Sequence, residues 1–328
     1  MKKAVCIIIS IIFIISCNSN EIKETEKESI ENNSIKINVG YLSDFAGASA
    51  IAIAKNKGFF EEENLDAKLY KFYNGHSAIL SIVSKEIDFS YIGHAAHNLI
   101  INGKAQILVP NAISKSEKII VNKDSNINSI QDLKGKTVAT HFGTSGEAML
   151  YISFKKSGLK KKDVNLMNIN ITNLENYLIN GKADAISTWL HFTNDYKVLA
   201  YITNYSDDIV LTSSFVSSLE YINKYPQIAK KFSRAILKAM DYRKYNMDEA
   251  VKLAAELIGS ETDEVRKEID SGVWFSSSDI ENALKSGDIL KWYEAQEQVF
   301  LYYDTIEQAV PVTNYIQLEM LKNVLNNL

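Results

Sequence analysis

Cysteine is almost absent from this chain, which has only two, Cys6 and Cys17, among its 328 residues. A domain folded from the residues after them has no thiol, which excludes disulfides, a cysteine nucleophile and cysteine-ligated metal centres. Arginine is also scarce, and Arg234, Arg243 and Arg266 all lie in the C-terminal third. The formal charge of −4 gives no reason to expect nucleic acid as a partner.

Long apolar runs are missing too, apart from residues 4–15, which follow a basic start. As a helix this run spans roughly 18 Å, against a bilayer core of roughly 30 Å. Together with Ser16 and Cys17 it resembles the signal of bacterial lipoproteins, in which the cysteine after the cut is lipidated. The resemblance implies an extracytoplasmic protein, in the periplasm or at the cell surface, that a lipid on Cys17 anchors to a membrane. An ordinary cleaved signal is the alternative.

From residue 35 onward, strand and helix patterns alternate. Strands are expected at 35–42, 67–73, 88–92, 105–112, 118–122, 137–141, 165–170, 184–188, 198–202 and 209–215, with helices at 47–59, 77–85, 94–102, 145–157 and 174–180. This alternation predicts βαβ units and parallel sheets. The C-terminal third is mostly helical, at 221–240, 248–258, 262–269, 278–303 and 316–325. A chain of this length exceeds the size of a single core, so we expect two lobes.

Four segments in order carry a family resemblance: GFFEEENL at 58–65, SIQDLKGK at 129–136, GTSG at 143–146, and the stretch from Trp292 to the C-terminus. They resemble the periplasmic-type substrate-binding proteins of ABC importers, in the branch that binds sulfonates, taurine, nitrate and thiamine precursors. The resemblance implies an α/β, bilobal periplasmic-binding-protein-like fold of type II. In that fold a two-segment hinge joins two α/β lobes, and a helical C-terminal tail packs on lobe 1.

The expected organisation follows from these patterns. We expect a signal peptide at 1–16, the lipidated cysteine and a flexible polar tether at 17–34, the first part of lobe 1 at 35–116, lobe 2 at 117–212, and the return to lobe 1 with the helical tail at 213–328. The chain then crosses between lobes near residues 114–121 and 209–217.

The resemblance implies capture of a small solute between the lobes and delivery to ABC permease and ATPase subunits, by a monomer without a cofactor or a resident metal. A small organic anion or zwitterion, alkanesulfonate- or taurine-like, is the leading solute. The alternatives are a thiamine-precursor pyrimidine or other heteroaromatic, and a metal-binding protein, sensor or adhesin on the same fold. Catalysis is not expected, since the related fungal pyrimidine synthase uses a cysteine-rich iron motif that this chain lacks.

Candidate ligand-binding residues lie in loops after the strands, because open α/β sheets bind ligands beyond the carboxyl ends of their strands. They are Asp44, Phe45, Gly47, Gly75, His76, Gly93, His94, His97, Phe142, Thr144, Ser145, Gly146, Trp189 and His191. The helix N-termini in these loops could bind an anion without an arginine.

Several of these residues have a second interpretation. Asp44 either caps a helix or holds the ammonium of a zwitterion. Residues 143–146 either contact the ligand or form a plain turn capped by Ser145. His94 and His97, spaced i and i+3, could instead reach one metal ion. Tyr73 is expected in the core.

Overall fold

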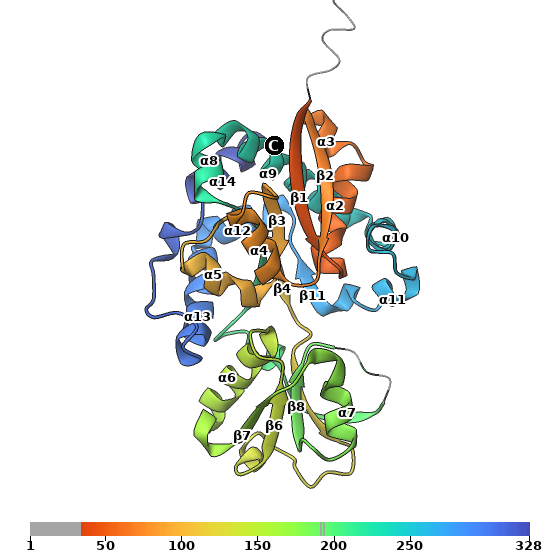
Figure 1. Ribbon diagram of the computed structural model, residues 1–328, viewed down its shortest axis with the longest axis vertical. Helices are drawn as coiled ribbons and strands as arrows, with labels where there is room; N and C mark the ends of the chain where they lie inside the picture. Colours follow the sequence, from red (N-terminus) through yellow and green to blue (C-terminus); the bar gives the residue numbers. More distant parts are fainter. Residues whose placement is uncertain (1–33, 191, 193) are drawn as a thin grey trace, which may run out of the picture. The chain divides into compact units, whose positions relative to one another are not determined.

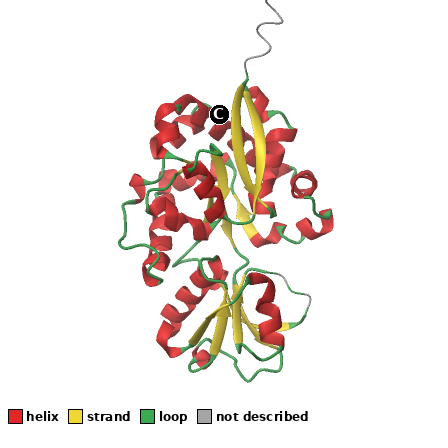
Figure 2. Cartoon of the chain, viewed as in Figure 1, coloured by secondary structure: helices red, strands yellow, loops and turns green. Residues whose placement is uncertain are grey.

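The computed structural model describes residues 34–190, 192 and 194–328, so Cys17 and His191 lie outside the described part (Figures 1 and 2). The expected signal peptide, lipidation site and nearly all of the tether also lie outside it. Two β-sheets, each flanked by helices, make up the described chain. We call the six-stranded sheet and its helices lobe 1, and the five-stranded sheet and its helices lobe 2.

Lobe 1 contains a sheet of order β11-β4-β10-β3-β1-β2. Its strands are β1 (Ile35–Leu42), β2 (Leu65–Phe72), β3 (Phe89–Ile92), β4 (Gln106–Ser114), β10 (Leu211–Ser217) and β11 (Gly272–Trp274). β1 and β3 are parallel, whereas β10 is antiparallel to both β3 and β4. β1, β3 and β4 therefore end at one edge of the sheet, where β10 and β11 begin.

The helices of lobe 1 come from both ends of the sequence. The early ones are α2 (Phe45–Asn56), α3 (Phe59–Glu62), α4 (Gly75–Val83) and α5 (His97–Ile101), the last preceded by a 3₁₀ turn at His94–Ala96. The late ones are α8 (Leu219–Lys224), α9 (Pro226–Tyr245), α10 (Met247–Ile258), α11 (Thr262–Arg266), α12 (Ser277–Ser286), α13 (Asp288–Tyr302) and α14 (Leu318–Leu325). The two sets share one core, in which Phe89 of β3 stacks on Phe232 of α9 with centroids 4.1 Å apart.

Lobe 2 contains a sheet of order β7-β6-β8-β5-β9. Its strands are β5 (Lys118–Asn122), β6 (Thr137–Thr140), β7 (Asn165–Asn168), β8 (Ala185–Thr188) and β9 (Tyr196–Tyr201), and its helices are α6 (Ser145–Ser157) and α7 (Leu174–Ile179). β6 is parallel to β7 and β8, while β5 is antiparallel to β8 and β9. Four strands thus end at the edge where β5 begins.

The short linker of residues 115–117 joins the carboxyl edges of the two sheets. Ser114, the last residue of β4, pairs with the first residues of β10 and β11. Lys118, the first residue of β5, pairs with the last residues of β8 and β9. The second crossing returns from β9 through a 3₁₀ turn at Ile202–Tyr205 to β10. Both crossings therefore run between the edges that carry the predicted ligand loops.

Three sequence predictions about the elements are wrong. The sheets are mixed rather than parallel, because the first strand after each crossing runs antiparallel to its neighbours. These strands are β5 in lobe 2 and β10 in lobe 1. The helix expected at 278–303 is two helices, broken at Gly287 with a left-handed φ of 76°. The helix expected at 221–240 also divides, since Pro226 starts α9 after α8 has ended.

Helix α13 links the C-terminal tail to lobe 2 as well as to lobe 1. The Tyr303 hydroxyl, directly after α13, donates to the Glu147 carbonyl of α6 at 3.0 Å. The Tyr302 hydroxyl accepts from the Lys161 backbone N–H at 2.9 Å, and its ring packs against Tyr151 with centroids 5.1 Å apart. The lobes therefore touch at a third place besides the two crossings.

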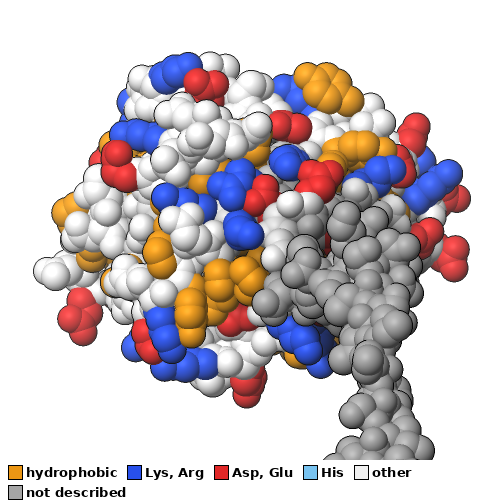
Figure 3. Space-filling model, turned by 90° about the horizontal axis from the view of Figure 1, so that it is seen from above, with side chains coloured by type: hydrophobic (Ala, Val, Ile, Leu, Met, Phe, Trp, Pro, Cys, Tyr) orange, Lys and Arg blue, Asp and Glu red, His pale blue; other side chains and the backbone are white. Residues whose placement is uncertain are grey.

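The face drawn in Figure 3 intersperses acidic, basic and hydrophobic side chains, so no single charge sign dominates that face. Among the described residues, none of the helices has both the length and the apolar character needed to cross a membrane.

Candidate functional site

The N-terminus of α2 lies at the carboxyl edge of lobe 1. Asp44 precedes this helix with extended backbone, and its Oδ1 accepts the Gly47 N–H at 2.6 Å. The capping interpretation of Asp44 is therefore correct, while a contact between Asp44 and a solute stays a prediction. Burial raises the pKa of Asp44, and the Gly47 N–H partly opposes that rise by favouring the ionised form. Gly47 is required here, since a Cβ would lie 2.7 Å from the Leu42 Cβ.

A second carboxylate, from Glu268, reaches the same helix N-terminus. Its Oε2 accepts the Phe45 N–H at 2.7 Å, although 223 residues separate the two in sequence. Burial, followed by the negative charge of Asp44, raises the pKa of Glu268 to about 7. Like charges this close oppose joint ionisation. The α2 N-terminus thus carries two carboxyl groups, and near neutral pH one of them readily takes up or gives up a proton.

Aromatic rings and a buried arginine pack behind the carboxyl edge of the lobe 1 sheet. Phe45, fully buried, packs edge-to-face against Trp274 of β11 with centroids 4.9 Å apart. The Trp274 indole N–H donates to the Ile269 carbonyl at 2.7 Å, and the Arg243 guanidinium lies 5.5 Å from the indole centroid. Arg243 is fully buried and donates to the Ser49 hydroxyl at 3.0 Å. Its charge therefore lies behind the aromatic layer rather than on the surface.

The N-terminus of α6 occupies the matching position in lobe 2, and the protein's own side chains fill it. The Gly143 N–H donates to Glu147 Oε2 at 2.6 Å, and the Thr144 hydroxyl donates to the His141 carbonyl at 2.5 Å. Thr144, not Ser145, is the N-cap residue, and its side chain makes no capping bond. Burial raises the pKa of Glu147. The predicted anion loop therefore already accommodates a carboxylate from its own helix.

Two of the predicted ligand residues, His94 and His97, lie in the interior. The two ring nitrogens of His97 contact the His94 carbonyl and the Ser214 hydroxyl, each at 2.9 Å. His94 contacts Gln296 and stacks on Phe300 of α13. Burial lowers the pKa of His94 to about 4 and that of His97 to about 3. These contacts favour a packing role, and the described residues include no group of three or more potential His, Cys, Asp or Glu metal ligands.

The remaining predicted ligand residues differ in how exposed they are. Phe142 and Trp189 leave part of their rings exposed, whereas Gly75 and Gly146 are buried where a Cβ would lie 2.8 Å from Ala96 and 2.3 Å from Thr140. His76, half-buried, contacts the Asn98 side chain at 3.1 Å. At Gly93 no atom lies within 4 Å of the position that a Cβ would take.

The expectation for Tyr73 is wrong. Its side chain is 89% exposed rather than in the core, because it follows the end of β2 in the turn before α4. Glu268 and Glu147 were not among the predicted site residues. Glu268 lies six residues before Trp274, and no local sequence pattern marks it as a partner of Phe45.

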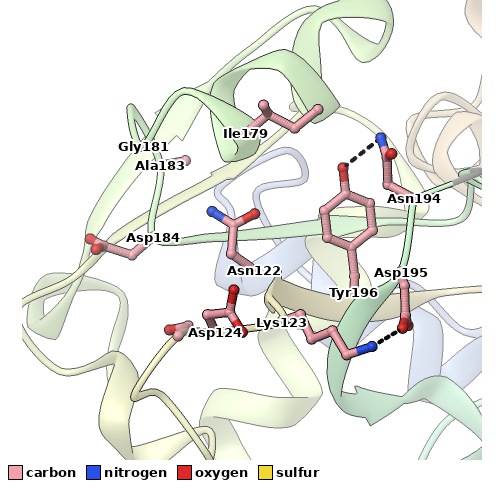
Figure 4. Close-up of a pocket in the computed structure, with 11 residues that line it drawn as sticks. Asn122, Lys123, Asp124, Ile179, Gly181, Ala183, Asp184, Asn194, Asp195 and Tyr196 are labelled. Atoms are coloured by element: carbon pink, nitrogen blue, oxygen red, sulfur yellow. Dashed lines mark hydrogen bonds and ion pairs between the residues drawn. The ribbon is translucent and has the colours of Figure 1, made fainter.

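A hollow of about 690 Å³ lies elsewhere, at the opposite edge of the lobe 2 sheet (Figure 4). Its lining includes Asn122 at the end of β5, Asp184 just before β8 and the Lys123–Asp195 ion pair. The Asn194 amide donates to the Tyr196 hydroxyl at 3.5 Å, and Figure 4 shows these two side chains next to each other in the lining. This hollow is separated from the ligand loops by the length of the strands, so it is not part of the candidate site.

Residues 46–250 match the model of the family described as NMT1/THI5 like. A provisionally named binding protein of Brucella abortus is 26% identical over 290 residues, covering 86% of this chain and 90% of its own. A Bacillus subtilis protein, provisionally named as an aliphatic sulfonates-binding protein, is 24% identical and covers 99% of this chain and 97% of its own.

Two solved structures share the fold at low sequence identity. The periplasmic aliphatic sulphonate binding protein SsuA from Escherichia coli has a TM-score of 0.71 at 16% identity, covering 87% of this chain and 92% of its own. The desulfurization enzyme DSZB has a TM-score of 0.65 at 15% identity, covering 89% and 99%. The predicted bilobal periplasmic-binding-protein-like fold is confirmed. Because a binding protein and an enzyme share that fold, function has to be argued from the site.

Proposed function

Because this chain belongs to the NMT1/THI5-like family, we propose that it is the extracytoplasmic solute-binding component of an ABC importer. It binds a small solute between the carboxyl edges of the two sheets and delivers it to permease and ATPase subunits, without catalysis. Relatives that match most of the chain and carry names of binding proteins support this assignment. In this proposal Cys17 carries the lipid anchor, residues 35–116 and 213–328 form lobe 1, and residues 117–212 form lobe 2.

The solute carries a cationic or N–H-rich nitrogen group. The observation that supports this is the pair of carboxyl groups, Asp44 and Glu268, at the N-terminus of α2. Both carboxyl groups accept backbone N–H groups of α2. An anion at this helix end would therefore face two carboxyl groups and not unbonded N–H donors. An ammonium or an aminated ring instead supplies the donors that the remaining carboxylate lone pairs accept.

The α6 loop supports the same solute class. Since Glu147 already accepts the Gly143 N–H, a sulfonate at this loop would have to displace or repel a carboxylate. A zwitterion of the taurine type fits the site if its ammonium lies at Asp44 and its sulfonate lies away from Glu147. A plain alkanesulfonate lacks the group that these residues select.

An aminated pyrimidine is the second candidate, favoured by the aromatic residues beside the carboxyl pair. Trp274 and Trp189 are both partly exposed, and a flat ring gains contact area against an exposed aromatic side chain. The ring's exocyclic amine would donate to Asp44 or Glu268.

A thermal-shift panel on the purified, metal-free protein tests the proposal. It contains taurine with ethanesulfonate as the matched analogue without the amine, then nitrate, hydroxymethyl aminopyrimidine, zinc and nickel. A solute at about 100 times its Kd stabilises the protein by about 2.7 kcal/mol, which is several degrees at this size. We expect a shift with an aminated solute and none with ethanesulfonate.

Three other outcomes contradict parts of the proposal. Equal shifts in melting temperature with taurine and ethanesulfonate would show that the amine does not contribute to binding. A shift with a metal alone would indicate that the ligand is a metal and not an organic solute. No shift with any compound would favour a sensor or adhesin on this fold.

A further inference from the structure

Helix α13 ends at two consecutive tyrosines that contact lobe 2. The Tyr303 hydroxyl donates to the backbone carbonyl of Glu147, in the first turn of α6, at 3.0 Å. The side chain of the same Glu147 accepts the Gly143 N–H. The predicted solute loop at residues 143–146 therefore adjoins a turn that is held both by its own helix and by a residue 156 positions later in the chain.

The direction of this hydrogen bond is fixed by its chemistry. The Tyr303 hydroxyl is the donor, because a backbone carbonyl has no proton to give. Burial raises the pKa of Tyr303, so the hydroxyl keeps its proton at neutral pH. A carbonyl oxygen has two lone pairs, so Glu147 can accept this bond besides one within its own helix. The contact adds a fixed point to a helix turn whose N-cap side chain makes no capping bond.

Apolar packing surrounds the hydrogen bond. Val299 of α13 is 2% exposed and belongs to the buried cluster that also contains Phe154 of α6. Tyr302 and Tyr303 are partly buried and pack against the same cluster. The Lys161 ammonium lies 5.3 Å from the centre of the Tyr303 ring, where the ring attracts a cation. The end of α13 is thus part of the lobe 2 core.

The preceding part of α13 is anchored to lobe 1. The Tyr293 hydroxyl lies 2.7 Å from the Ser214 hydroxyl of β10. The Gln296 amide donates to the Thr212 hydroxyl of the same strand at 2.6 Å. Tyr293 and Gln296 are each 1% exposed, so water does not compete for these bonds. Because roughly 10 Å along the helix separates Gln296 from Tyr303, one helix joins β10 of lobe 1 to the first turn of α6.

We infer that Tyr303 is a positioning residue that holds the first turn of α6, with Thr144 and Gly146, at a fixed place relative to β10. The hydrogen bond to Glu147 and the anchoring of α13 on β10 carry this inference, and the meaning of the loop for solute binding rests on the proposed function. Turning lobe 2 about the crossings moves α6 relative to β10, so this bond has to break or α13 has to move. Tyr303 thereby couples the predicted solute loop to lobe 1 through the C-terminal tail.

Hydrogen exchange without any solute tests the positioning step alone. Tyr303→Phe keeps the ring and removes the hydroxyl, and the loss of one hydrogen bond should speed exchange of the amides of residues 145–148 about two- to tenfold. Tyr302→Phe is the matched control, because that hydroxyl accepts the Lys161 N–H instead. It should speed exchange at Lys161 and leave residues 145–148 unchanged. Unchanged exchange at 145–148 in Tyr303→Phe, or an equal rise there in both variants, would overturn the inference.

A variant in lobe 1 tests whether α13 transmits the position of β10. Tyr293→Phe removes the hydroxyl that contacts Ser214, and exchange at residues 145–148 should rise although the change lies in lobe 1. In the double variant Tyr293→Phe/Tyr303→Phe the rise should be smaller than the product of the two single effects, because the connection is already cut. An effect of Tyr293→Phe that stays within lobe 1 would show that Tyr303 only packs locally, and would also overturn the inference.

Solute binding is measured second and separately. If an aminated solute binds the wild type, Tyr303→Phe should weaken its affinity about two- to fivefold, and Tyr302→Phe should leave it unchanged. Faster exchange with no solute bound by any variant would contradict the proposed function while supporting the positioning role. Faster exchange with unchanged affinity would contradict the link between the α6 turn and the solute. Normal exchange with normal solute binding would contradict the positioning role alone.

Discussion

The N-termini of α2 and α6 lie at matching places in the two lobes, and carboxylates accept backbone N–H groups at both, but in different ways. At α2 the helix has its own cap, Asp44, and a remote second carboxyl, Glu268. At α6 the N-cap side chain makes no capping bond, and Glu147 of the same helix accepts the Gly143 N–H. Asp44 and Glu268 are partly exposed, while Glu147 is buried.

The difference indicates separate roles for the two ends. The partly exposed carboxyl groups at α2 can contact a solute, whereas the buried carboxylate at α6 holds its own loop in place. A sequence motif that marks a helix N-terminus therefore does not identify an anion site, because the acceptors that fill it can come from anywhere in the chain.

The largest effect is expected from removing charge at α2. Asp44→Asn keeps an N-cap of equal quality, so the helix start should remain. The loss of a charged hydrogen bond costs about 1.5–3 kcal/mol, so the Kd of an aminated solute should rise about 10- to 100-fold. Isothermal calorimetry measures this change. An unchanged Kd in Asp44→Asn would show that the α2 end does not meet the solute.

Overpacking the α6 end should cost stability rather than affinity alone. In Gly146→Ala the new Cβ would lie 2.3 Å from the Thr140 Oγ1 and 3.0 Å from the Ser187 carbonyl oxygen. We expect about 1–3 kcal/mol of destabilisation in denaturant unfolding. Gly93→Ala is the control, since no atom lies within 4 Å of its Cβ position. Equal stability of the two variants would contradict the tight packing of α6 on its sheet.

The pH dependence of stability should differ between the two ends through Glu268. Burial, with the charge of Asp44, raises the pKa of Glu268 from 4.5 to about 7, so the folded state holds a proton that the unfolded state has lost in this window. Its contribution is present below pH 4.5 and is lost as the pH rises to about 7. Melting curves of wild type and Glu268→Gln should therefore converge at low pH and separate toward pH 7, with the wild type losing stability relative to the variant. Curves that stay parallel would contradict the raised pKa.

The smallest effect is expected far from both ends, at the hollow in lobe 2. The Lys123–Asp195 ion pair there is exposed, and such pairs contribute about 0–1 kcal/mol. Lys123→Ala should change neither the melting temperature by more than a degree or two nor the solute affinity. A loss of affinity in this variant would relocate the solute site to the hollow.

Sequence patterns predicted helices and strands well where the pattern lies within the element itself. The bounds of α6 and β5 were predicted correctly from helical spacing and a short apolar run. Strand direction was not, because β10 and β11 enter the sheet antiparallel only after the chain has crossed and returned. Tyr73 was expected in the core, but the turn after β2 leaves it exposed.

The candidate site was predicted only in part. Asp44 was identified because it directly follows a strand and begins a helix. Glu268 was missed, since its contact with Phe45 spans 223 residues and no local pattern marks it.

The most direct test of the account is a calorimetric titration of one matched pair of solutes. The pair consists of the aminated solute with the largest thermal shift and the same molecule without its amine, each titrated into wild type and Asp44→Asn. We expect wild type to bind the aminated solute at least tenfold more tightly than its analogue, and Asp44→Asn to lose most of this preference. Equal affinity for both solutes, or a preference that survives in Asp44→Asn, would contradict it.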